Sequence, residues 1–148
     1  MQRRIVPDII ENQELFTLSP SDSVRDAVRV MTERKIGAVL IKRDDQLAGI
    51  FTERDVLTRI VDAGLDANAT KLAEVMTVDP DTLAPSDRAV DALMKMSSRG
   101  YRHLPVVDEG QLVGIVSIRD IFGAVQKELE SDLAQRDQLI FDTGYGVG

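Results

Sequence analysis

Two short segments of the chain place a hydroxyl and a carboxylate at the same spacing. They are Gly49-Ile50-Phe51-Thr52-Glu53-Arg54-Asp55 and Gly114-Ile115-Val116-Ser117-Ile118-Arg119-Asp120. In each, the hydroxyl stands between a strand-like and a helix-like pattern. The first amides of a helix are unpaired and its N-terminus is partly positive, so this position suits an anion such as phosphate. The aspartate can accept hydrogen bonds from a ribose diol, so each pair suits a ribose phosphate.

The same residues also have an interpretation that needs no ligand. Thr52-x-x-Asp55 and Ser117-x-x-Asp120 match the capping box, in which the hydroxyl and the carboxylate bind amides at the start of a helix. For one copy alone, capping is the simpler interpretation. Two copies expected to face one cleft favour ligand binding at one site at least.

Basic residues distinguish the second copy from the first. Tyr101-Arg102-His103 places an aromatic ring and two potentially cationic groups just before a strand, whereas the aligned Ile36-Gly37-Ala38 offers none. Arg54 and Arg119 lie inside the two segments and could add phosphate contacts. Plain solvent exposure is the alternative for all these basic residues. We expect two chemically unequal ligand sites, seen as two affinities or as one occupied site per chain.

The composition argues against several classes of function. A net charge of −7 and a pI near 4.7 disfavour nucleic-acid binding, which needs a concentrated basic surface. With no cysteine and His103 as the only histidine, neither a disulfide, a thiol nucleophile nor a metal site built on these residues is expected. Glycine-rich phosphate loops and serine triads are also missing, so we expect no catalytic site. Neither a membrane span nor a signal peptide is evident, which makes the cytoplasm the expected location.

The two segments belong to an internal repeat. A shift of 65 residues aligns positions 19–57 with 84–122 without a gap, and 13 of the 39 aligned pairs are identical. Composition alone would give about two or three identities, so the duplication is real.

Each copy predicts the same order: strand, helix, strand, strand, helix. Short strands at 16–18 and 82–84 are followed by Ser21-Asp22 and Ser86-Asp87, which are expected to start the helices. Hairpins follow, and helical segments at 7–12 and 71–76 lead into the copies. Apolar residues recur with helical spacing at Val24, Ala27, Val28 and Met31, and at Ala89, Ala92, Leu93 and Met96. The closing helices are expected to turn inward Val56, Leu57, Ile60 and Val61 in the first copy and Ile121, Phe122 and Val125 in the second.

The pattern of glycine, apolar residues, hydroxyl and aspartate, found twice, resembles the signature of the CBS domain family over about residues 9–126. The resemblance implies an α/β (α+β) fold in which two CBS repeats pack by pseudo-twofold symmetry into one CBS-pair module. It implies a regulatory or sensor protein that binds an adenine nucleotide: AMP, ADP, ATP or NAD(H). Nucleotide contacts are then expected from Thr52, Asp55, Ser117 and Asp120, with further contacts from Tyr101, Arg102, His103, Arg54 and Arg119.

The expected domains are residues 1–70, the first repeat with its lead-in helix, 71–126, the second repeat, and 127–148, a helical extension with a flexible tail. Signals would pass to an unknown regulated protein or alter the chain's own assembly. The alternative is a structural or partner-binding dimer with vestigial clefts. A homodimer is expected in both cases, because the closing helices leave apolar residues for a second chain to cover. Apolar residues continue at Leu129 and Leu133, which predicts a longer helix that is either a dimer arm or a solvated helix on its own subunit.

Overall fold

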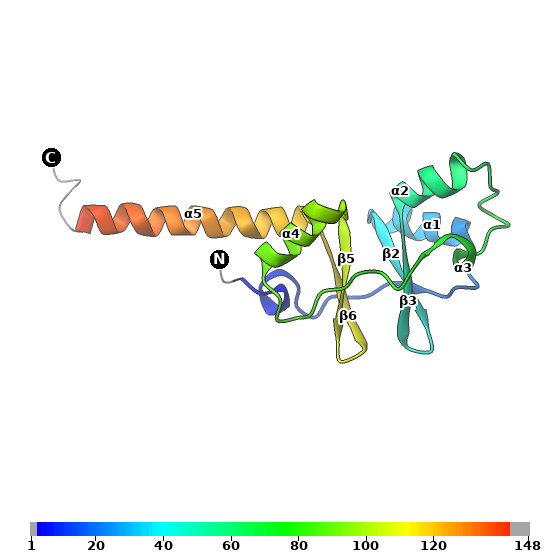
Figure 1. The fold of residues 1–148 in the computed structure, drawn as a ribbon, viewed down its shortest axis with the longest axis horizontal. Coiled ribbons are helices and arrows are strands. Elements are labelled where there is room, and N and C mark those ends of the chain that lie inside the picture. Colours follow the sequence, from blue (N-terminus) through cyan, green and yellow to red (C-terminus); the bar gives the residue numbers. More distant parts are fainter. Residues whose placement is uncertain (1–2, 143–148) are drawn as a thin grey trace. The chain divides into compact units, whose positions relative to one another are not determined.

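A computed structural model describes residues 3–142, with side chains described as far as residue 139. The predicted glycine-rich tail, Gly144–Gly148, lies outside the described residues. The elements are η1 (Ile5–Ile9), β1 (Thr17–Leu18), α1 (Val24–Arg34), β2 (Ala38–Arg43), β3 (Gln46–Thr52), α2 (Glu53–Asp55), η2 (Val56–Val61), α3 (Leu72–Val75), β4 (Thr77–Val78), α4 (Ala89–Arg99), β5 (His103–Asp108), β6 (Gln111–Ser117) and α5 (Ile118–Asp142). The predicted order of strands and helices is confirmed for the first copy (Figure 1). In the second copy the helix, the hairpin and the closing helix are found, but the strand expected at 82–84 is reduced to a single bridging residue, Leu83, so that β5 and β6 form a two-stranded sheet.

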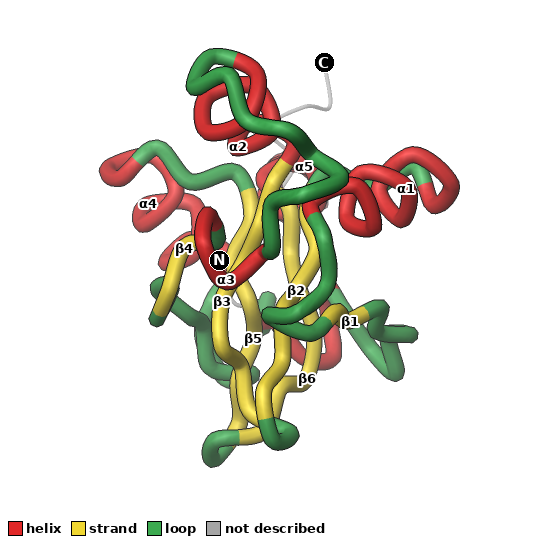
Figure 2. The backbone as a smooth tube through the Cα atoms, turned by 90° about the vertical axis from the view of Figure 1, so that its right-hand side faces the viewer, coloured by secondary structure: helices red, strands yellow, loops and turns green. Residues whose placement is uncertain are grey.

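The chain divides into two compact units. One contains residues 13–82 and 105–114, and the other contains residues 1–12, 83–104 and everything from 115 onward. The unit that contains residues 13–82 is called the first-repeat unit. It contains a four-stranded sheet in the order β1-β2-β3-β4. β1 runs parallel to β2, and the other pairs are antiparallel, with β2 and β3 as the long central strands (Figure 2).

The core of the first-repeat unit lies between this sheet and the helices. Phe51 of β3 is fully buried at its centre. Burying a large apolar side chain completely contributes roughly 1.5–3 kcal/mol to stability. Its partners come from α1, β2, η2 and the segment around α3: Val24, Ala27, Met31, Val39, Ile41, Ile60, Leu72 and Met76.

In the other unit, α4 and the first turns of α5 pack together. Ile121 of α5 is fully buried, and Ala124 is almost so. Beyond this contact α5 continues as a long straight helix (Figure 1). No helix within residues 3–142 is both long and apolar enough to cross a membrane.

The starts of the long helices differ from the prediction. α1 begins after Ser23, whose hydroxyl accepts a hydrogen bond from the amide of Asp26, while the Asp26 carboxylate accepts one from the amide of Ser23. Asp22 instead accepts a hydrogen bond from the amide of Ser19. Asp87 does the same for Ala84, so the predicted caps Ser21-Asp22 and Ser86-Asp87 were placed too early. These aspartates close the turn that leads into each helix.

Both hairpins use two-residue turns with a left-handed backbone. Asp44 and Asp45 have φ values of 51° and 61°, and Glu109 and Gly110 have 48° and 80°. Positive φ at both central residues matches the twist of the flanking strands. These two turns connect β2 to β3 and β5 to β6.

Each lead-in segment packs on the helix start of the other repeat. The amides of Leu72 and Ala73 donate to the carbonyls of Asp22 and Pro20, at 2.9 Å each. The equivalent bonds in the other unit run from Ile5 to Asp87 and from Val6 to Pro85, also at 2.9 Å. The helical turn of the first lead-in is Ile5–Ile9, not 7–12, because Ile10 is already extended. The domain boundaries 1–70, 71–126 and 127–148 follow the sequence repeat and stay a prediction.

Three residues predicted to face inward are exposed. Leu57 and Val61 on η2 are 62% and 66% exposed, and Phe122 on α5 is 54% exposed. The core takes only Ile60 and, in part, Val56 from η2. A helix at the surface of a protein buries one stripe, so the neighbouring apolar positions remain outside.

Candidate functional site

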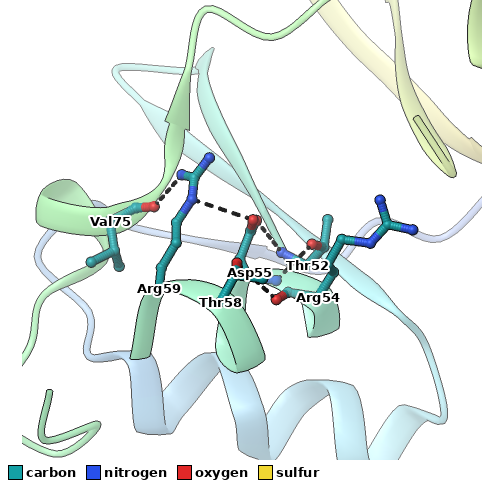
Figure 3. Close-up of polar contacts among 6 residues, drawn as sticks. All are labelled: Thr52, Arg54, Asp55, Thr58, Arg59 and Val75. Atoms are coloured by element: carbon teal, nitrogen blue, oxygen red, sulfur yellow. Dashed lines mark hydrogen bonds and ion pairs between the residues drawn. The ribbon is translucent and has the colours of Figure 1, made fainter. Parts of the chain in front are cut away.

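The first signature forms the junction between β3 and α2. The Thr52 hydroxyl accepts a hydrogen bond from the amide of Asp55 at 3.2 Å. In return, Oδ2 of Asp55 accepts one from the amide of Thr52 at 3.0 Å (Figure 3). This is the reciprocal capping box, so the interpretation without a ligand describes the local structure correctly. The other oxygen of the Asp55 carboxylate, Oδ1, takes no part in the cap and can bind another group.

In the first repeat, that second oxygen is occupied by an arginine. Nε of Arg59 lies 3.5 Å from Oδ1 of Asp55, and its Nη1 donates to the carbonyl of Val75 at 2.6 Å. Figure 3 shows the Arg59 side chain between these two acceptors. The Asp55 side chain is only 14% exposed. Asp55 is therefore partly neutralised and has little room for a ribose.

The second signature has the same cap without the arginine. The Ser117 hydroxyl accepts from the amide of Asp120 at 3.2 Å, and Oδ2 of Asp120 accepts from the amide of Ser117 at 3.1 Å. The residue aligned with Arg59 is Ala124, which cannot form an ion pair. Asp120 is exposed, and within residues 3–142 it makes no ion pair. Its outer oxygen is available to a hydroxyl donor.

Backbone hydrogen bonds join each signature to the loop before the preceding strand. The amide of Ile118 donates to the carbonyl of Arg102 at 2.8 Å, and the amide of Glu53 donates to the carbonyl of Gly37 at 3.0 Å. The structure thus brings the backbone of Arg102 next to the second signature, in its own repeat. At the equivalent place in the first repeat stands Gly37, so the first signature has no basic side chain at this position.

One amide of each first helical turn is unpaired among the described residues. In α5, the amide of Ile118 bonds to Arg102 and that of Asp120 bonds to Ser117, while the Arg119 amide has no partner among the described residues. The same is true of the Arg54 amide in α2. Both arginine side chains are exposed, and Figure 3 shows the guanidinium of Arg54 pointing away from Asp55. An open amide beside an arginine can bind a phosphate oxygen.

Two further predicted residues precede or begin β5. Tyr101 and His103 are both half-buried, with Arg102 exposed between them. No group of three or more histidine, cysteine, aspartate or glutamate residues is placed to hold a metal ion in the described part of the chain.

Arg59 is the residue that the sequence interpretation missed. The sequence does contain a signal for this ion pair, because an aspartate and an arginine four residues apart on a helix lie next to each other. Asp55 is thus both a helix cap and the ion-pair partner of Arg59, and this double role is what restricts the first signature.

Comparison with known proteins agrees with the repeat. The CBS domain model matches residues 6–62 and again residues 72–127. A curated relative, the mitochondrial CBS domain-containing protein CBSX3 of Arabidopsis thaliana, is 37% identical over 129 residues, which are 84% of this chain and 62% of that protein. The chain therefore spans less than two thirds of this relative's length.

Solved structures agree as well. A protein with CBS domains from Burkholderia ambifaria MC40-6 superposes with a TM-score of 0.77 at 34% identity, over 81% of this chain and 92% of that one. CBSX2 in complex with AMP superposes with a TM-score of 0.66 at 26% identity, over 78% of this chain and 90% of that one. With two matches that together span most of its length, the chain belongs to the CBS domain family.

Proposed function

We propose that this protein is a regulatory module that binds an adenine nucleotide at the second signature and has no catalytic role. CBS-pair proteins are regulatory modules, and one structural neighbour is a complex with AMP. The observation that carries the proposal is the unequal state of the two aspartates. Asp55 is held by Arg59, whereas Asp120 is exposed, follows the open Arg119 amide and lies two residues after Ile118, whose amide bonds to the Arg102 carbonyl.

Each part of a nucleotide has a candidate partner there. The outer oxygen of Asp120 would accept hydrogen bonds from the ribose diol. The Arg119 amide at the N-terminus of α5 and the Arg102 guanidinium would bind phosphate. AMP, ADP, ATP and NAD(H) all contain a ribose and at least one phosphate. The number of phosphates would decide how many of the phosphate-binding groups, the Arg119 amide and the Arg102 guanidinium, each ligand contacts. Thr52 and Asp55 would form a weaker site, or none.

Thermal denaturation with millimolar AMP, ADP, ATP, NAD and NADH tests this proposal. A ligand at 100 times its dissociation constant adds about 2.7 kcal/mol to stability, which raises the melting temperature by several degrees. Inorganic phosphate and adenosine, added separately, are the controls for the two halves of the ligand. A melting temperature unchanged by every nucleotide would favour the alternative, a scaffold with vestigial sites.

We also propose that the protein is a homodimer. Leu57 and Phe122 occupy aligned positions of the two closing helices, and both are more than half exposed. Exposed large apolar residues repeated in this way suit an isologous contact with a second chain. Light scattering at micromolar concentration should give at least twice the mass of the 16.3 kDa chain, and a monomer mass would refute the dimer. A cytoplasmic location and a separate regulated partner remain expectations from the sequence.

A further inference from the structure

The C-terminal half of α5 carries an apolar face with no partner among the described residues. Leu129, Leu133 and Leu139 are 47%, 56% and 64% exposed. In Figure 1 this part of the helix runs on alone beyond α4, within the same unit. An open groove runs along the face and is lined by Leu129, Asp132, Leu133, Gln135, Arg136 and Leu139.

Four of these residues follow the spacing of a helix pair. Leu129, Asp132, Arg136 and Leu139 are separated by three, four and three residues, which are the a and d positions of two heptads. We call these four residues the seam of α5. It has leucines at both ends and opposite charges in the middle. Asp132 and Arg136 form no ion pair with each other or with another residue of the described chain.

The seam is complementary to itself when reversed. About a centre at Ala134, Leu129 exchanges with Leu139, and Asp132 exchanges with Arg136. In an antiparallel pair whose twofold axis passes at the level of Ala134, a residue before the centre in one copy faces the residue that lies equally far after the centre in the other copy. Leucine then faces leucine, and aspartate faces arginine, at both ends of the pair. A parallel pair would instead set Arg136 against Arg136 and Asp132 against Asp132, which is repulsive.

We propose that residues 126–142 of α5 pair antiparallel with the same segment of a second copy of this chain, centred at Ala134. The length follows from the register, because the helix ends at Asp142, eight residues after the centre, and its equivalent lies eight residues before it. The leucine layers exclude water from the two Asp132–Arg136 ion pairs between the copies. The helix is already anchored by Ile121, so pairing does not have to order it. The inference rests on α5 alone and does not depend on nucleotide binding.

Cysteine crosslinking tests the register directly, since the chain contains no cysteine of its own. Leu129→Cys and Leu139→Cys are prepared separately, mixed and oxidised. We expect a disulfide-linked dimer from the mixture and little from either variant alone, because position 129 of one copy faces position 139 of the other. Ala134→Cys is the matched control: it lies at the central level but on the far side of the helix, and should not crosslink. Stronger crosslinking within each single variant would show a parallel pair, and no crosslinking in any sample would refute the pairing.

Charge reversal gives a second measurement by sedimentation. Asp132→Arg and Arg136→Asp each place like charges at both central layers, so each should weaken self-association through α5 by about tenfold or more. Mixing the two variants pairs arginine with aspartate in both layers and should restore association. Nucleotide binding by either variant should match the parent protein, which separates this proposal from the nucleotide site. Unchanged association in both single variants would overturn the proposal.

Discussion

Replacement of Gly49 by alanine is expected to lower the free energy of unfolding by about 1–3 kcal/mol, because the added methyl group has no room. Gly49 lies in β3, paired with Ile41 of β2 on one side and Val78 of β4 on the other. A Cβ at this position would come within 2.7 Å of the Thr77 carbonyl oxygen and 2.8 Å of the Met76 sulfur. The methionine side chain can turn aside, but the carbonyl belongs to the backbone of β4. Relief therefore requires that the edge strand move.

Gly123 provides the matched control for this substitution. It lies inside α5, and a Cβ there would meet nothing within 4 Å. Alanine should stabilise the helix by about 0.5–1 kcal/mol, since glycine loses more backbone entropy on folding. Urea denaturation of both variants measures the two changes, which should have opposite signs. If Gly49→Ala is as stable as the parent protein, β4 does not pack against β3 as closely as described.

Local patterns were sufficient to predict most of the elements. The helical spacing of Val24, Ala27 and Met31 reports the buried face of one helix, and the repeat supplied an independent second copy of the same pattern. Both hairpins and both long helices follow the predicted order. The strand expected at 82–84 is reduced to a single bridging residue, Leu83.

Long-range pairing was less predictable. The lead-in segments pack on the opposite repeat, and nothing in the residues around Ile5 or Leu72 identifies which helix start will accept their hydrogen bonds. The sequence also predicted that more residues of the closing helices would be buried than the structure shows. Leu57, Val61 and Phe122 are apolar and correctly spaced, but each closing helix buries only one stripe of its surface, and these residues lie outside it. The capping pairs were identified by spacing, whereas the difference between them depends on Arg59.

Replacement of Asp120 by alanine is expected to weaken nucleotide binding by about tenfold to a hundredfold. Removing the acceptor leaves the ribose hydroxyls poorly paired, at a cost of about 1–3 kcal/mol, and 1.4 kcal/mol corresponds to about tenfold in affinity. Asp55→Ala is the matched variant, because it removes the same carboxylate from the same kind of cap. Its effect on binding should be under about threefold, since Asp55 already bonds to Arg59 and is nearly buried.

Arg59→Gln tests the reason for this difference. Without the guanidinium, Oδ1 of Asp55 is released, while its cap to the Thr52 amide remains. We expect a second, weaker nucleotide-binding event to appear or to strengthen in this variant. Calorimetric titration of all three variants with the nucleotide that stabilises the parent protein most gives affinity and stoichiometry together.

Stability must be measured alongside binding, because both aspartates also cap helices. Loss of a cap costs about 0.5–2 kcal/mol, and the two alanine variants should share this loss whatever the ligand does, while Asp55→Ala also loses the ion pair with Arg59. A difference in binding at similar stability therefore reports the ligand contact and not the fold. If Asp55→Ala loses the nucleotide and Asp120→Ala keeps it, the ligand lies at the first signature, and Arg59 assists binding instead of opposing it. If both variants bind as tightly as the parent protein, the two signatures serve only as helix caps, and the proposed nucleotide site is wrong.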